Sequence, residues 1–113
     1  MPTRLWFFKS ASPDVVRYDL YMVDDGVPLV RDESGNVPGA TVFNLGNPGV
    51  DNQNKIWIDM EALPGITDKD GTFDFGVAAV DDAGNPSAFL KIEDVSLDFI
   101  PPDAPSAGGI VRS

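Results

Sequence analysis

The chain contains no cysteine and no histidine among its 113 residues. Without cysteine it can form neither disulfides nor thiolate metal sites. Without histidine it lacks the commonest general base and the commonest metal ligand. The sequence also has no Gly-x-Ser-x-Gly turn and no phosphate-binding Gly-x-x-x-x-Gly-Lys-Ser/Thr loop. These absences indicate a protein that is not an enzyme, with no catalytic residue and no cofactor.

Adjacent carboxylates are the remaining candidates for acid–base chemistry. They occur as Asp24-Asp25, Asp81-Asp82 and Glu93-Asp94. General acid catalysis needs one carboxyl group buried enough to stay protonated beside another that is ionised. Each pair falls in a predicted turn or on the exposed face of a strand, so we do not expect these groups to be catalytic.

Long apolar runs are absent too, which excludes a membrane-spanning segment. Met1–Lys9 has one positive charge followed by only four apolar residues, too few for the apolar region of a signal peptide. We therefore expect a protein that either stays inside the cell or has lost its leader.

Positive charge is scarce. Eighteen acidic residues against eight basic ones give a net charge of −10. Nucleic acids and anionic membranes are bound by clusters of Lys and Arg, so neither is expected as a partner. An acidic surface can attract cations or a basic protein, or it can simply keep the chain soluble.

Proline and glycine are abundant, with ten and eleven residues respectively. They divide the chain into short runs of alternating polarity, which is typical of an all-β sandwich, and no helix of convincing length is found. The expected strands cover residues 5–9, 15–23, 27–31, 41–45, 55–60, 73–79 and 88–97.

The most informative run extends from Leu63-Pro-Gly65 through an alternating strand to the turn Asp81-Asp-Ala-Gly-Asn-Pro-Ser87. Phe73, Phe75 and Val77 fall on one face of that strand. This run resembles the second half of a fibronectin type III domain, in which an aromatic-x-aromatic-x-Val-x-Ala-Val-Asp strand precedes a Gly-Asn-x-Ser turn. The resemblance implies an immunoglobulin-like antiparallel sandwich of about seven strands and favours an extracellular or particle-surface location.

The first half of the chain resembles the family less closely. Tyr18-Asp-Leu-Tyr21 matches the family's third strand, and Phe8 stands at the spacing of its core tryptophan, with Trp6 on the same face. The family's corner tyrosine is replaced by Phe73. With this alignment the alternation predicts a core of Trp6, Phe8, Val16, Tyr18, Leu20, Ile56, Ile58, Leu63, Phe73, Phe75, Val77 and Ala79.

The family's opening strand is missing, because the chain begins at the equivalent of the second strand. The other end, Pro101–Val111, looks like the missing Pro-rich lead and strand. We therefore divide the chain into a sandwich over residues 1–98 and a Pro/Gly-rich tail over residues 99–113. The tail is either a linker to a further domain or a donor strand, which pairs with its own sandwich or with a neighbour's.

A surplus of apolar residues suggests an interface. If Trp6 and Phe8 face the core, Leu5 and Phe7 face outward beside Trp57 of the neighbouring strand. Exposed aromatic patches often mark interfaces, although a long loop or the tail could equally cover this one. The predicted interface residues are Leu5, Phe7, Trp57, Ile110 and Val111.

Calcium is not expected as a ligand. Asp68-Lys-Asp70-Gly resembles the start of a calcium loop, but the third ligand and the distant Glu are missing. Asp and Gly are also ordinary turn residues. Asp68 and Asp70 remain weak candidates only, and we predict no metal site.

The sequence thus predicts a non-catalytic structural or protein-binding module whose partner is protein, most simply another copy of itself. Head-to-tail strand addition need not close and would build a filament. Two alternatives remain. One is a spacer or ligand-binding accessory module of a longer secreted protein, in which Trp57 with Asn54 and Asp59 touches carbohydrate. The other is a phage or virion surface protein.

Overall fold

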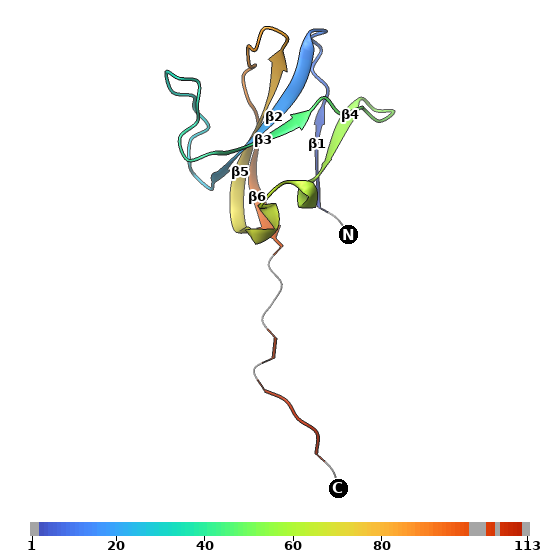
Figure 1. Cartoon of the computed structure of the whole chain (residues 1–113), viewed down its shortest axis with the longest axis vertical. Helices are drawn as coiled ribbons and strands as arrows, with labels where there is room; N and C mark the ends of the chain where they lie inside the picture. The colour runs from blue at the N-terminus through green and yellow to red at the C-terminus, as the bar shows by residue number, and fades with distance from the viewer. Residues whose placement is uncertain (1–2, 100–103, 106, 112–113) are drawn as a thin grey trace.

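The protein is an antiparallel β-structure with almost no helix (Figure 1). The computed structural model describes residues 3–99, 104–105 and 107–111. Residues 3–99 form the folded part, called the body below. The elements are β1 (Arg4–Phe8), β2 (Val15–Asp24), β3 (Thr41–Gly46), β4 (Lys55–Asp59), η1 (Met60–Ala62), η2 (Ile66–Asp68), β5 (Asp70–Asp81) and β6 (Leu90–Asp98).

The described chain has six strands rather than the expected seven. The difference is the stretch Val27–Arg31, which forms no strand. Pro28 has no amide hydrogen to donate, and Val27 closes a turn by donating to the carbonyl of Asp24. Leu29 is instead buried by packing against other side chains, so its apolar character reflects packing and not strand pairing.

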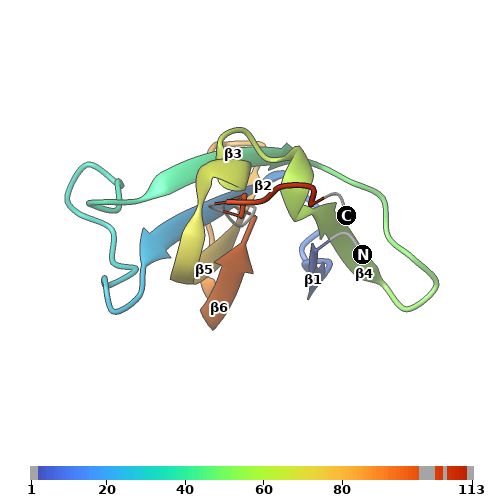
Figure 2. The same ribbon diagram turned by 90° about the horizontal axis from the view of Figure 1, so that it is seen from below.

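The strands form two separate sheets. One contains only β1 and β4, and the other has the order β3-β2-β5-β6, with every pair antiparallel. Figure 2, viewed from below, shows β1 and β6 as edge strands on the same side of the body. The two helices described are three-residue 3₁₀ turns. No helix in the described residues has the length and apolar character that crossing a membrane requires.

The main core lies between the two sheets. Tyr18, Leu20 and Phe75 of the larger sheet are almost fully buried, as are Ile56 of β4 and Ile66 of η2. Burying each such side chain stabilises the fold by roughly 1.5–3 kcal/mol. The alternation in β4 and β5 therefore predicted their inward faces correctly.

Three predicted core residues lie outside the core. Trp6, Phe8 and Val16 are 42%, 59% and 47% exposed. The register of β2 against β5 shifts between Val15 and Arg17, so Val15 packs against the core in place of Val16. In β1 the inward residues are Leu5 and Phe7, the opposite phase to the one expected.

A second, smaller apolar cluster covers the outer face of the four-stranded sheet. Val23 of β2 is buried there with Leu29 and Val37 from the segment that joins β2 to β3. Gly76 makes this approach possible, because a Cβ at this position would lie 3.0 Å from the Cδ1 atom of Phe89 and 3.3 Å from that of Leu29. The chain itself therefore covers the β2 and β5 part of this face, while Val42 of β3 stays half exposed.

Candidate interaction surface

One edge of β1 carries backbone groups that no described strand pairs with. Two backbone hydrogen bonds flank the β1–β4 ladder: the Lys9 amide donates to the Asn54 carbonyl, and the Met60 amide donates to the Thr3 carbonyl. Antiparallel ladders alternate, so Leu5 and Phe7 are the β1 residues that exchange bonds with β4. The amides and carbonyls of the other three residues, Arg4, Trp6 and Phe8, therefore point toward the opposite side, which we call the free edge of β1.

An apolar groove lies beside this free edge. Its volume is about 520 Å³, and it is lined by all five residues of β1 and by Leu90, Ile92 and Val95 of β6. Arg4 is the only charged residue in this lining. This β1–β6 groove thus separates edge strands of the two sheets and combines apolar walls with unpaired backbone groups. An extended peptide with apolar side chains has the matching chemistry.

Two of the other sheet edges, those of β4 and β6, carry features that oppose pairing. At β4, both backbone groups of Lys55 are used by the preceding turn: its amide donates to the Asp51 carboxylate and its carbonyl accepts from the Asp51 amide. At β6, a bulge places Asp94 at a φ of 58° beside the charged Glu93. Bulges and charges are the usual means by which edge strands avoid pairing. β1 has no bulge, and its register against β4 is regular.

The outer face of the two-stranded sheet is aromatic. Trp6 and Trp57 are directly opposite each other, with ring centroids 6.3 Å apart, and Phe8 meets Trp6 edge-on at 5.3 Å. Trp57 is 38% exposed, as expected. We call Trp6, Phe8 and Trp57 the aromatic face. Its position on the molecule was predicted correctly, but its β1 members were not.

Leu5 and Phe7 were expected on this face and are instead buried, at 7% and 2% exposure. All four residues of Leu5–Phe8 are apolar, so alternation could not decide which pair faces inward. The flanking charges do not decide which face is exposed either. Arg4 lies on the face of Trp6 and Phe8, whereas Lys9 lies on the face of Leu5 and Phe7. The structure decides by pairing Leu5 with Ile58 and Phe7 with Ile56, which lie on the inward side of β4.

Two cations lie over the aromatic face. The Arg4 guanidinium is 4.6 Å from the Trp57 ring centroid, and the Lys55 ammonium is 4.3 Å from that of Trp6. In the described part of the chain the one ion pair is Arg17 with Asp19. These cations are therefore held over the indole rings by cation–π attraction. A sugar would have to compete with them for the ring faces, which does not favour the carbohydrate alternative.

Trp57 is also held from its edge. Its indole Nε1 donates to the Asp51 carboxylate at 2.7 Å, and the same carboxylate accepts from the Gln53 and Lys55 amides. The indole bond, followed by the Lys55 amide bond, holds the pKa of Asp51 below its usual value. Asp51 therefore fixes the orientation of Trp57, a role that the sequence alone did not indicate. The Asp59 carboxylate serves the backbone instead, since it accepts from the Glu61 amide.

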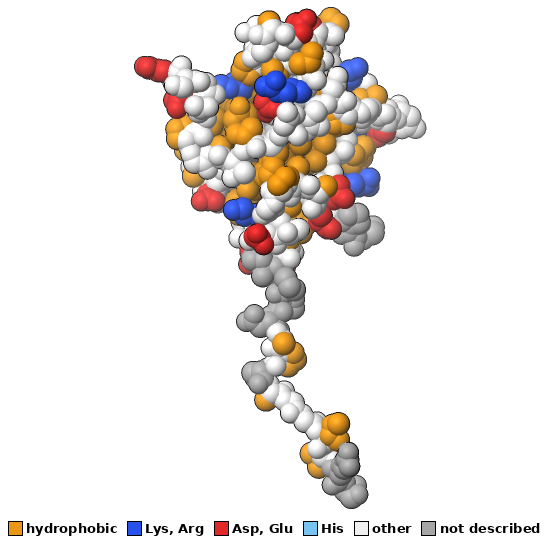
Figure 3. Space-filling model, viewed as in Figure 1, with side chains coloured by type: hydrophobic (Ala, Val, Ile, Leu, Met, Phe, Trp, Pro, Cys, Tyr) orange, Lys and Arg blue, Asp and Glu red, His pale blue; other side chains and the backbone are white. Residues whose placement is uncertain are grey.

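The tail is exposed where it is described. Residues 104–105 and 107–111 belong to no strand, and Ile110 and Val111 are 88% and 96% exposed. Figure 3 shows apolar side chains on this part of the tail with no atoms of the body beside them. In a single chain, then, the described tail does not cover the free edge of β1. An exposed tail and an uncovered β1 edge are what a single copy shows if its tail pairs only with a neighbouring copy.

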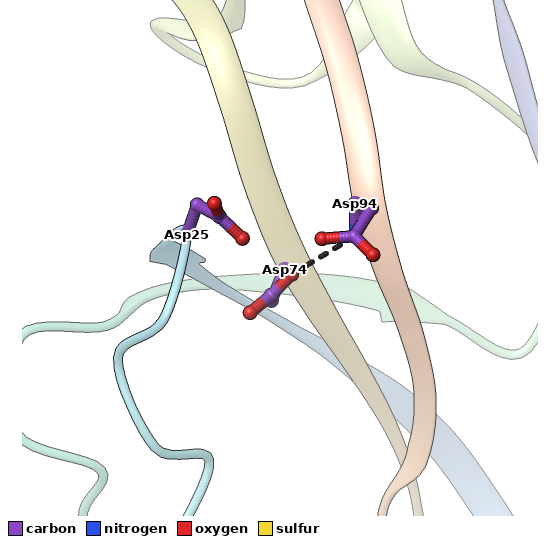
Figure 4. A group of neighbouring side chains, drawn as sticks. All are labelled: Asp25, Asp74 and Asp94. Atoms are coloured by element: carbon purple, nitrogen blue, oxygen red, sulfur yellow. Dashed lines mark hydrogen bonds between the residues drawn. The ribbon is translucent and has the colours of Figure 1, made fainter.

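An acidic cluster lies where β2 ends, beside the bulge between β5 and β6 (Figure 4). Carboxylate oxygens of Asp25, Asp74 and Asp94 lie within 4.8 Å of one another. Asp74 is buried and accepts backbone hydrogen bonds from Gly26 at 3.3 Å and Asp94 at 2.9 Å. Desolvation, and then the carboxylates of Asp74 and Asp94, raise the pKa of Asp25. Asp74 thus has a structural role in holding the β6 bulge.

The weak calcium candidates lie elsewhere. Asp68 ends η2 and Asp70 begins β5, and both are exposed. Among the described residues neither belongs to a group of three carboxylates close enough to share an ion. The structure therefore adds no ligand to the pair that the sequence suggested.

No protein-family model, no curated protein and no solved structure matches this chain. What can be said of its function rests on the free edge of β1, the β1–β6 groove, the aromatic face and the tail.

Proposed function

We propose that this chain is a non-catalytic structural module that assembles with copies of itself by β-strand addition. The tail of one copy pairs with the free edge of β1 in the next and places an apolar side chain in the β1–β6 groove. The observation that carries the proposal is that a groove lined by apolar residues runs beside three residues whose amides and carbonyls have no partner among the described strands.

The tail has the properties of such a donor. Ile110 and Val111 are apolar and β-branched, and both are almost fully exposed in the single chain. Burying a side chain of this size is worth roughly 1.5–3 kcal/mol. Each backbone hydrogen bond to the free edge adds about 0.5–1.5 kcal/mol. Main-chain bonds supply affinity in strand addition, and side-chain pockets supply specificity.

We also propose that the body is a variant of the fibronectin type III fold in which no described strand fills the place of the first strand. In that fold the first strand lies beside the second, whose equivalent here is β1. Among the described strands that place is empty, which agrees with a sheet of only two strands and a free edge at β1. A spacer or particle-surface module, the alternatives, would need neither an open edge nor an apolar tail.

Removing the tail tests the proposal. We expect the full chain to form particles larger than one copy and a variant lacking residues 101–113 to be a monomer, measured by size-exclusion chromatography with light scattering. Replacing Ile110 and Val111 with serine should have the same effect without shortening the chain. The matched control is Val30→Ser, which removes a valine that is 62% exposed elsewhere. Equal masses for the full and shortened chains would refute the proposal.

A further inference from the structure

The directions of β1 and β6 restrict how a tail can reach the free edge. β6 runs antiparallel to β5, and β5 runs antiparallel to β2. Figure 1 shows that β6 ends at the same end of the body at which β1 begins, so the two strands run in opposite directions. The tail therefore leaves the body at the end where β1 begins and not at the end where β1 stops.

A tail that folded back onto its own β1 would pair in parallel. It would have to turn at once after Asp98 and then run from Arg4 toward Phe8. The structure shows the opposite course, since the described tail residues continue away from the body along its long axis (Figure 1). The chain accordingly measures 74 Å along its longest axis and only 36 Å along the second.

We propose that successive copies stack head to tail, and that the donated strand enters the β1–β6 groove at Phe8 and runs antiparallel to β1. This inference rests on the proposed function and adds the polarity of the assembly. A copy placed beyond the Phe8 end extends its tail in this direction without a turn. The nine Cα–Cα steps from Asp98 to Ala107 span up to about 30 Å when extended, which is enough to connect adjacent bodies.

Side-chain sizes agree with the antiparallel direction. Ala107–Val111 has the same length as β1, which is five residues. Antiparallel alignment of the two segments places Ala107, Gly108 and Gly109 opposite Phe8, Phe7 and Trp6, and the larger Ile110 and Val111 opposite Leu5 and Arg4. Residues directly opposite each other have Cβ atoms about 4.5–5.5 Å apart, so small residues fit best beside aromatic rings.

The parallel direction fits less well. It places Ile110 opposite Phe7 and Val111 opposite Phe8, while Gly108 lies beside Leu5. In the antiparallel alignment Ile110 lies opposite Leu5, so the two side chains project to the same face of the sheet. Leu5 is buried, and Ile110 therefore points into the groove toward Ile92 and Val95. Gly109 and Val111 then lie on the outer side, with the aromatic face.

Cysteine cross-linking tests the direction, and the chain offers a clean background because it has no cysteine. A disulfide needs Cα atoms within about 4.4–6.8 Å. Mixing Val111→Cys chains with Arg4→Cys chains should give a disulfide-linked peptide pair that contains residues 4 and 111, identified by mass spectrometry. Ala107→Cys with Phe8→Cys should behave in the same way.

The reversed pairs are the matched controls. Val111→Cys with Phe8→Cys, and Ala107→Cys with Arg4→Cys, should cross-link no faster than either tail variant does with Ser34→Cys, an exposed loop position. We expect at least a tenfold difference in rate between the two sets.

The outcomes separate this inference from the proposed function. Preferential cross-linking of the reversed pairs would overturn the polarity and leave strand addition standing. No preferential cross-link, with a particle mass that still depends on the tail, would also overturn the polarity, because the tail would then lie away from β1. No cross-link together with a mass that does not change when the tail is removed would refute the proposed function itself.

Discussion

The two sheets of this protein differ in how completely the chain covers them. The four-stranded sheet has its outer face covered by the segment between β2 and β3, and its β6 edge is interrupted by a bulge. The two-stranded sheet has an exposed aromatic outer face and a free β1 edge beside an apolar groove. The chain thus covers most of one face of the larger sheet, whereas the smaller sheet has an exposed apolar face and a free edge beside a groove. This contrast supports an interaction role at β1 and β4.

The largest expected effect separates two neighbouring residues of the smaller sheet. Phe7 is 2% exposed and Phe8 is 59% exposed. The two side chains are identical, and they differ only in which face of β1 they occupy. Phe7→Ala should lower the free energy of unfolding by about 3–5 kcal/mol, because it leaves a cavity in the core. Phe8→Ala should lower it by less than about 1 kcal/mol. Urea unfolding of dilute chains measures both, and equal losses would show that the phase of β1 is wrong.

The covered face of the larger sheet gives the next effect. Gly76→Ala should cost about 1–3 kcal/mol, because the added Cβ would press on Phe89 and Leu29. Gly49→Ala is the control: its Cβ would meet no atom within 4 Å, and no positive φ is recorded for it. A Gly76 variant as stable as the control would mean that the segment does not pack on this face as described.

One carboxylate beside each sheet provides the smallest effect. The pKa of Asp51, next to the two-stranded sheet, is lowered in the folded state, so its contribution to stability is present above pH 3.8 and is lost as the pH falls through the folded pKa. The pKa of Asp25, next to the larger sheet, is raised, so its contribution is present below pH 3.8 and is lost as the pH rises through the folded pKa.

These opposite shifts predict opposite mutational effects at pH 7. Asp51→Asn should lower the melting temperature, because the charged acceptor of the Trp57 indole is lost. Asp25→Asn should raise it, because a repelled charge is removed. Both differences should shrink as the pH is lowered below 3.8. Calorimetry at pH 7 and pH 3 checks this, and effects of the same sign at pH 7 would contradict the assignment.

Much of the fold could be predicted from the sequence. β5 was recognisable because Phe73, Phe75 and Val77 alternate with small or polar residues between two turns. β4 was recognisable because Ile56 and Ile58 flank a single tryptophan. In each case only one face has the residues of a core, and the structure buries that face.

The candidate site was predictable only in part. β1 is apolar at four successive positions, so its phase depends on the pairing with β4, which the sequence does not specify. The groove requires Ile92 and Val95 to lie across from β1, a relation between strands far apart in sequence. The exposure of Trp57 was predictable because it stands between two isoleucines, and the role of the tail with Ile110 and Val111 stays a prediction.

Amide hydrogen exchange in β1 tests the central claim most directly. In the full chain, assembled, the amides of Arg4, Trp6 and Phe8 should exchange slowly, because they donate to the tail of a neighbour. Removing residues 101–113 should return these three to rapid exchange while Leu5 and Phe7, which are bonded to β4, stay protected in both. Exchange of Arg4, Trp6 and Phe8 that is the same with and without the tail would contradict strand addition at the free edge of β1.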